Sequence, residues 1–189
     1  MLLSTGITDK SPSSQVLNPE MKSHAIRFCP VCDGFEATDK RIGVLGPPRH
    51  AGAKALFLRT YSRAVTLVPI SDAGFEEVDP AVETAPSSAS KIIESDGCLL
   101  AELNNGQTIP FDLIYPAMGS HAHSDLAVAL GAKTNEAGCL LVDQKQQTTV
   151  AGLYAAGDVV SDLHQLVLAE GHAAIAATAI HNSLPVNLR

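Results

Sequence analysis

Positive charge is scarce in this sequence. Its 189 residues include 13 lysines and arginines against 20 aspartates and glutamates, which gives a formal net charge of −7. A basic face that could bind nucleic acid or an anionic membrane is therefore not expected. Long apolar runs are also missing, and no stretch approaches the roughly 18 residues of a membrane span. Residues 1–6 have no basic region before an apolar stretch, so they do not read as a signal peptide, and we expect a cytoplasmic protein.

Cysteine is scarce as well, because four cysteines are too few for a disulfide scaffold in a chain of this size. Cys98 and Cys139 stand alone, whereas Cys29 and Cys32 have only two residues between them. A structural zinc site needs a second ligand pair at similar spacing, and none is present, so we expect no metal site. The spacing alone leaves three interpretations of the pair open: redox-active, half of a zinc site, or inert.

The residues around this pair favour redox chemistry. Two cysteines at this spacing come within disulfide reach in a turn, and the thiolate is the attacking species in disulfide exchange. Asp33, directly after Cys32, is a candidate proton donor or acceptor for that step. We call residues 28–34, Phe-Cys-Pro-Val-Cys-Asp-Gly, the cysteine turn.

Hydrophobic periodicity predicts an α/β protein. A buried strand, an apolar-striped helix and a second β-branched strand follow one another within about 30 residues, which indicates a βαβ unit and a parallel sheet. The acidic, then Ser/Ala/Pro-rich stretch 71–90 reads as a surface excursion, and Asp-Gly at 96–97 predicts a hairpin. The elements expected from these patterns are strands at 41–45, 64–68, 111–116, 138–142 and 152–156, and helices at 51–61 and 165–184.

The loop of this βαβ unit departs from a nucleotide-binding sequence. Such a loop reads Gly-x-Gly-x-x-Gly/Ala, and the matching residues here, 46–51, are Gly-Pro-Pro-Arg-His-Ala. Gly46 and Ala51 fit the first and third positions, but Pro48 occupies the middle one, where its ring and missing N–H oppose a pyrophosphate. Arg49 could still meet an anion at the helix start. We call residues 46–51 the glycine loop and expect it to bind NAD(P)H poorly.

Two passages together resemble thioredoxin reductases and their close flavoprotein relatives. One is the cysteine turn, and the other is residues 148–158, Thr-Thr-Val-Ala-Gly-Leu-Tyr-Ala-Ala-Gly-Asp. The resemblance implies an open three-layer, Rossmann-like FAD/NAD(P)-binding fold that lacks the N-terminal FAD-binding half. It assigns 1–24 to a remnant of the first flavin-domain segment and linker, 25–117 to an NAD(P)-binding-type domain, and 118–189 to the second flavin-domain segment.

The same resemblance implies roles for individual residues. Cys29 and Cys32 are the redox-active disulfide of such enzymes, and Asp33 is their acid/base partner. On the flavin side, Gly157 and Asp158 end a buried strand, and the aspartate accepts a hydrogen bond from a ribityl hydroxyl of FAD. The residues that present the following helix start to the flavin pyrimidine are His164, Gln165 and Leu166.

The function that this resemblance implies is disulfide reduction. Electrons pass from FAD through the Cys29–Cys32 disulfide to a protein disulfide, such as that of a thioredoxin-like partner, and the resemblance implies a homo-oligomer. An alternative of a different class is a non-catalytic truncated homologue, or a half-chain that acts as an assembly partner. The cysteine turn favours the enzyme, and the glycine loop favours the alternative.

Overall fold

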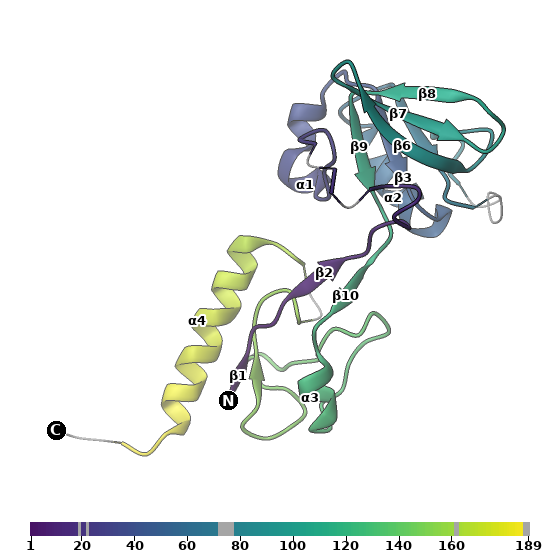
Figure 1. The fold of residues 1–189 in the computed structure, drawn as a ribbon. Coiled ribbons are helices and arrows are strands. Elements are labelled where there is room, and N and C mark those ends of the chain that lie inside the picture. The colour runs from purple at the N-terminus through teal and green to yellow at the C-terminus, as the bar shows by residue number, and fades with distance from the viewer. Residues whose placement is uncertain (19, 22, 72–77, 161–162, 187–189) are drawn as a thin grey trace. The chain divides into compact units, whose positions relative to one another are not determined.

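The fold is known from a computed structural model that describes residues 1–18, 20–21, 23–71, 78–160 and 163–186. The chain divides into two compact units, each of which is described by itself (Figure 1). The first unit combines Met1–Thr8 with Ser120–Arg189, and the second is Asp9–Gly119.

The second unit is built around a parallel sheet with strand order β5-β4-β3-β9. Ile42 of β3 pairs with Val65 of β4 on one side and Leu113 of β9 on the other. The central strands are buried along their whole length, as expected for a sheet covered on both faces. The strands are β3 (Ile42–Leu45), β4 (Val65–Val68), β5 (Glu83–Thr84) and β9 (Leu113–Pro116).

Helix α2 (Pro48–Leu58) covers one face of this sheet. It starts earlier than the sequence pattern predicts, at Pro48, because proline suits the first turn of a helix, where its missing N–H is not needed. Ala51, Ala55 and Leu58 lie on its buried side against the strands. The small alanine side chains let the helix lie close to the sheet.

An antiparallel sheet covers the other face, and it completes three layers (Figure 1). Its strands are β6 (Ala89–Ser95), β7 (Cys98–Leu103) and β8 (Thr108–Phe111), in the order β6-β7-β8. The predicted hairpin is confirmed: Asp96 and Gly97 both have positive φ, at 49° and 79°, as a tight turn between β6 and β7 requires. The predicted α/β class is therefore confirmed in this unit.

The first unit contains less regular secondary structure than the second. It contains the pairs β1 (Leu2–Leu3) with β11 (Tyr154–Ala155) and β2 (Ile7–Asp9) with β10 (Ser120–Ala122), together with helices α3 (Asp125–Ala129) and α4 (Leu166–Ser183). Its core gathers β1, β11 and the loops around Leu140 and Val159. Helix α4 matches the helix predicted at 165–184 to within a residue at each end.

Two expectations were wrong. The strand predicted at 138–142 is absent from the described residues there, because Leu140 and Val142 make only isolated bridges within a turn-rich segment. The stretch 71–90 is not simply a surface excursion: its described part, outside 72–77, contains β5 and buries Val82 and Ala85 in the two cores. Both errors arise because short, irregular segments carry too little periodicity to reveal their pairing. Among the helices of the described residues, none combines the length and apolar character that crossing a bilayer takes.

Candidate active site

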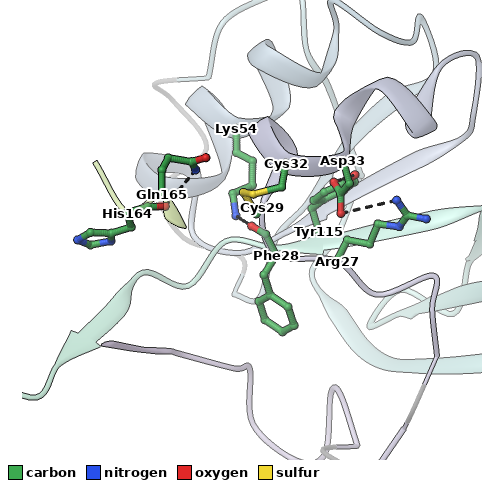
Figure 2. Close-up of a disulfide and its surroundings, with 9 residues drawn as sticks. All are labelled: Arg27, Phe28, Cys29, Cys32, Asp33, Lys54, Tyr115, His164 and Gln165. Carbon is green, nitrogen blue, oxygen red and sulfur yellow. Dashed lines mark hydrogen bonds and ion pairs between the residues drawn. A yellow bond between two sulfur atoms is a disulfide. The ribbon is translucent and has the colours of Figure 1, made fainter. Parts of the chain in front are cut away.

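The cysteine turn forms a disulfide in the structure. The Cys29 and Cys32 sulfurs are 2.01 Å apart, and their Cα atoms are 5.3 Å apart (Figure 2). A single helical turn, α1 (Pro30–Asp33), contains Cys32 and begins directly after Cys29, and the amides of Cys32 and Asp33 donate to the Cys29 carbonyl. The short 3-10 helix η1 (Gly34–Ala37) follows directly. Local backbone geometry thus holds the two cysteines in one turn.

The parallel sheet positions this turn. Residues 25–27 run beside β9: the Ile114 amide donates to the Ala25 carbonyl at 2.8 Å, and the Arg27 amide donates to the Ile114 carbonyl at 2.9 Å. This pairing sets the turn at the end of the sheet where β3 and β9 also end. In open α/β sheets, ligands and chemistry gather at the carboxyl ends of the strands.

The disulfide is accessible. Cys32 is exposed and Cys29 is half-buried. Around them the chain exposes apolar side chains, with Val31 65% and Phe35 83% exposed. An exposed disulfide with an apolar surround can be approached by another molecule, whereas a buried structural disulfide cannot.

Asp33 is held by two residues from outside the turn. The Tyr115 hydroxyl, on β9, donates to Asp33 Oδ1 at 2.7 Å, and Arg27 Nη1 lies 3.6 Å from Asp33 Oδ2 (Figure 2). Arg27 also binds Glu36 at 2.7 Å, and this hydrogen bond is the main cause that raises the pKa of the guanidinium. The pKa of Tyr115 is raised, first by burial and then by its bond to Asp33. Tyr115 therefore stays protonated and donates at any ordinary pH.

Lys54, on α2, brings a positively charged side chain to the cysteine turn. Its Nζ donates to the carbonyl of Phe28 at 2.9 Å and to that of Pro116 at 3.0 Å. Burial lowers the pKa of this amine, and the carboxylates of Asp9 and Asp33 partly offset the effect. Figure 2 shows that Lys54 and Asp33 flank the disulfide, since one reaches the residue before Cys29 and the other follows Cys32.

The glycine loop does not fit a pyrophosphate. A Cβ added at Gly46 would lie 2.5 Å from the Ala117 carbonyl oxygen, so this glycine serves the close packing of β3 against the segment after β9. Pro47 and Pro48 have no N–H, and the amides of His50 and Ala51 both donate to the Pro47 carbonyl. Two of the loop's N–H groups are thus missing, and those of His50 and Ala51 are occupied, which leaves fewer donors for a phosphate. Ala51 is fully buried in the core, and Arg49 is exposed on the first turn of α2.

The last three residues of the passage 148–158, Ala156, Gly157 and Asp158, line a pocket of 390 Å³ in the first unit. Gly157 has φ of +79°, and a Cβ there would already touch Ala169, so the chain turns tightly beside α4. Asp158 lines the pocket together with Leu166, the first residue of α4. A carboxylate that accepts hydrogen bonds, beside small residues and a helix start, suits the hydroxylated chain of a flavin, so these residues fit FAD.

His164 and Gln165 do not belong to the residues that line this pocket. Gln165 caps α4 through its backbone, and its side-chain amide donates to the His164 carbonyl at 3.0 Å. The structure therefore brings Gly157, Asp158 and Leu166 together, and it places the other two on the approach to the helix. No group of three or more His, Cys, Asp and Glu side chains suited to a metal occurs among the described residues.

Sequence reasoning missed three residues of the candidate site: Arg27, Lys54 and Tyr115. Arg27 lies two positions before Cys29 and could have been noticed as a charge beside a redox motif. Lys54 is the single charged residue between Ala51 and Leu58 of α2, which is a weak signal. Tyr115 looked like an ordinary buried strand residue, since nothing in the local sequence shows that its hydroxyl meets an aspartate 82 positions away.

These observations define an α/β protein whose parallel sheet carries a solvent-accessible disulfide at its carboxyl end. The comparison with protein families agrees. The model of the family described as pyridine nucleotide-disulphide oxidoreductase matches residues 2–179, and the chain belongs to this family.

Similar proteins narrow the relationship. The chain is 28% identical over 192 residues to a thioredoxin reductase of Peptoclostridium acidaminophilum, a match that covers 89% of this chain and 60% of the relative. The crystal structure of HlmI superposes with a TM-score of 0.83 at 26% identity and covers 96% of this chain and 58% of that one. Thioredoxin reductase from Streptococcus pyogenes MGAS5005 gives a TM-score of 0.81 at 24% identity, with 96% and 64% covered.

The chain thus spans about 60% of the length of the relatives that it matches. The fold predicted from the sequence, the FAD/NAD(P)-binding type of thioredoxin reductases, is confirmed. The likeness to a thioredoxin reductase is confirmed as well.

Proposed function

We propose that this chain is a thioredoxin reductase-like disulfide oxidoreductase in which Cys29 and Cys32 alternate between disulfide and dithiol. The observation that carries the proposal is the accessible disulfide itself, formed in a turn whose following residue, Asp33, is held by Tyr115 and Arg27. We assign the cysteine turn to a pyridine-nucleotide-type domain at 25–117. Residues 1–24 are then the remnant of the first flavin-domain segment together with a linker, and residues 118–189 are the second flavin-domain segment.

The chemistry of the dithiol depends on the charges beside it. In the reduced state one cysteine must become a thiolate before it attacks a disulfide. Asp33 can take that proton, and the Lys54 amine can stabilise the thiolate that remains, because a positive charge nearby favours the ionised thiol. Asp33 and Lys54 thus supply the two functions that exchange needs.

FAD is the cofactor that we infer for the first unit. It supplies an electron pair when bound, and Asp158, Gly157 and Leu166 are the residues that would hold it. We also assign His164 and Gln165 to the approach to its pyrimidine end. The visible absorption spectrum of the purified chain tests this: a flavin band in the wild type, diminished in Asp158→Ala, supports the assignment, and a colourless protein that takes up no added FAD contradicts it.

The substrate that we infer is a protein disulfide, such as that of a thioredoxin-like partner. Val31 and Phe35 are exposed beside Cys32, and such an apolar surround suits the contact surface of a protein better than a small polar thiol. Replacement of Phe35 by Ser should raise the KM for a thioredoxin-like substrate and leave reduction of a small disulfide reagent unchanged.

Thiol counting tests the central proposal. The oxidised and the reduced chain should differ by two thiols, and the difference should vanish in Cys32→Ser. Cys98→Ser is the matched control, because Cys98 is a free cysteine, and it should keep the difference. Equal counts in the two states of the wild type, or one tightly bound zinc ion per chain, would overturn the proposal.

A second candidate function is that of an assembly partner. Helix α4 exposes Leu166 by 78% and Val167 by 75%, and a second pocket, of 640 Å³, lies along its residues 174–183. Apolar surface of this kind favours association, at about 25 cal/mol per Å² buried. Sedimentation should show a homo-oligomer at micromolar concentration, and a compact monomer would count against this candidate.

A further inference from the structure

Tyr115 combines complete burial with one polar contact. It lies on β9, is 0% exposed, and its ring packs in the core beneath α2 with Leu58 and Val44. A phenylalanine would satisfy this packing equally well. What tyrosine adds is the hydroxyl, and its partner is the Asp33 carboxylate at 2.7 Å. Buried tyrosine hydroxyls need a partner, but this partner is the residue next to the disulfide.

Asp33 faces solvent on one side and the core on the other. Its side chain is 25% exposed, so solvent reaches it, yet Oδ1 is fixed by the strand-borne hydroxyl. Arg27 approaches Oδ2, and Arg27 is itself anchored by Glu36 and by the His24 carbonyl. The tyrosine is the member of this network that the sheet holds in place.

We propose that Tyr115 is a positioning residue for disulfide exchange: its hydroxyl holds the Asp33 carboxylate in an orientation in which it can receive a proton from the cysteine pair. This inference rests on the proposed redox function of Cys29 and Cys32. It extends that function by assigning the acid/base group a fixed orientation from the core of the unit.

In the exchange, the attacking cysteine thiol gives its proton to the Asp33 carboxylate, and the thiolate attacks one sulfur of the partner disulfide. A mixed disulfide forms, and the second partner sulfur leaves as a thiolate that takes the proton back from Asp33. The other cysteine thiol then gives its proton to Asp33 and attacks the mixed disulfide. The Cys29–Cys32 bond forms, the remaining partner sulfur leaves and takes that proton, and the partner has gained two electrons and two protons.

The hydroxyl determines which way the Asp33 carboxylate faces. Oδ1 is fixed by Tyr115, whereas Arg27 lies 3.6 Å from Oδ2 and is shared with Glu36. The Lys54 amine reaches the residue before Cys29. Without the hydroxyl, the carboxylate loses this orientation and receives the thiol proton less often. The exchange rate should therefore fall at low pH, and the difference from the wild type should fade at high pH, where the thiols ionise without a base.

The test is the pH dependence of reoxidation by oxidised glutathione. The reduced chain is mixed with the reagent between about pH 5 and 9, quenched by alkylation, and the Cys29–Cys32 disulfide is quantified by mass spectrometry. Tyr115→Phe should be about three- to tenfold slower at the acid end, because a misoriented carboxylate loses part of the roughly 10²–10⁴-fold that a positioned base contributes, and equal to the wild type at the alkaline end. The matched control, Tyr61→Phe, should follow the wild type.

A second variant separates positioning from damage to the fold. In an Asp33→Asn background, Tyr115→Phe should have no further effect on the rate at any pH, because the hydroxyl acts through the carboxylate. Equal profiles for wild type and Tyr115→Phe, or a slowing that is the same at every pH and persists in the Asp33→Asn background, would overturn the inference and leave the redox function standing. A wild-type pair that glutathione does not reoxidise would instead overturn the proposed function.

Discussion

The cysteine turn and the glycine loop lie in the same unit and at neighbouring parts of the same sheet, but their residues are used differently. In the cysteine turn, the groups that chemistry needs are supported from a distance by Tyr115, Arg27 and Lys54. In the glycine loop, Gly46 packs against Ala117, and the amides of the next helical turn donate to the Pro47 carbonyl.

This difference shows that the two motifs differ in what supports them: the groups of the cysteine turn are held by residues that lie elsewhere in the chain. Conversely, a retained glycine is not evidence of a binding site when packing alone explains it. The glycine loop keeps the βαβ fold that the disulfide requires, because α2 carries Lys54 to the cysteine turn. The two regions therefore belong to one packed structure, in which the candidate chemistry lies at the cysteine turn.

The largest expected effect concerns NADPH. We expect the wild type to bind it far more weakly than low micromolar, since that affinity corresponds to roughly −8 kcal/mol of contacts that the glycine loop does not offer. Calorimetric titration measures the affinity for NADPH directly. A low-micromolar dissociation constant would show that the glycine loop binds a ligand after all. The double variant Pro47→Gly, Pro48→Gly should tighten binding only partly, because the residues directly after Val68 supply neither an acid nor an arginine for the ribose.

Much of the fold could be predicted from the sequence, because the strands at 42–45 and 65–68 and helix α4 are strongly patterned. The shortest strand pairings could not be predicted, because one or two residues carry no periodicity. Examples are β5 and the isolated bridges at Leu140 and Val142. In the candidate site, the local motif indicated the disulfide and the adjacent Asp33. The contact of Asp33 with Tyr115 depends on how distant segments meet, and no local pattern encodes it.

The next effect in size concerns stability. Gly46→Ala should destabilise the chain by about 1–3 kcal/mol, because its Cβ would lie 2.5 Å from a backbone oxygen that cannot move freely. Gly52→Ala is the matched control within α2: a Cβ there meets nothing within 4 Å, and alanine should stabilise the helix by about 0.5–1 kcal/mol. Denaturant unfolding measures both. If Gly46→Ala proved as harmless as Gly52→Ala, the packing account of the glycine loop would be wrong.

The smallest effect concerns Lys54, which joins the two regions. Lys54→Met keeps much of the length of the side chain but loses the bonds to the Phe28 and Pro116 carbonyls, and it should cost about 1–2 kcal/mol at neutral pH. Lys91→Met, at an exposed position, is the control and should stay within about 0.5 kcal/mol of the wild type.

The pH dependence of this effect has a definite sign. Burial lowers the pKa of Lys54 in the folded chain below its usual value of 10.5, so the unfolded chain binds more protons between the two values. The contribution of Lys54 to stability therefore rises with pH over that window, up to 10.5, and is least below the folded pKa. Unfolding of the disulfide-intact chain should show a larger gap between wild type and Lys54→Met near about pH 10 than at about pH 7. A gap that narrows with pH would mean that the charge of the amine, and not its buried hydrogen bonds, ties α2 to the cysteine turn.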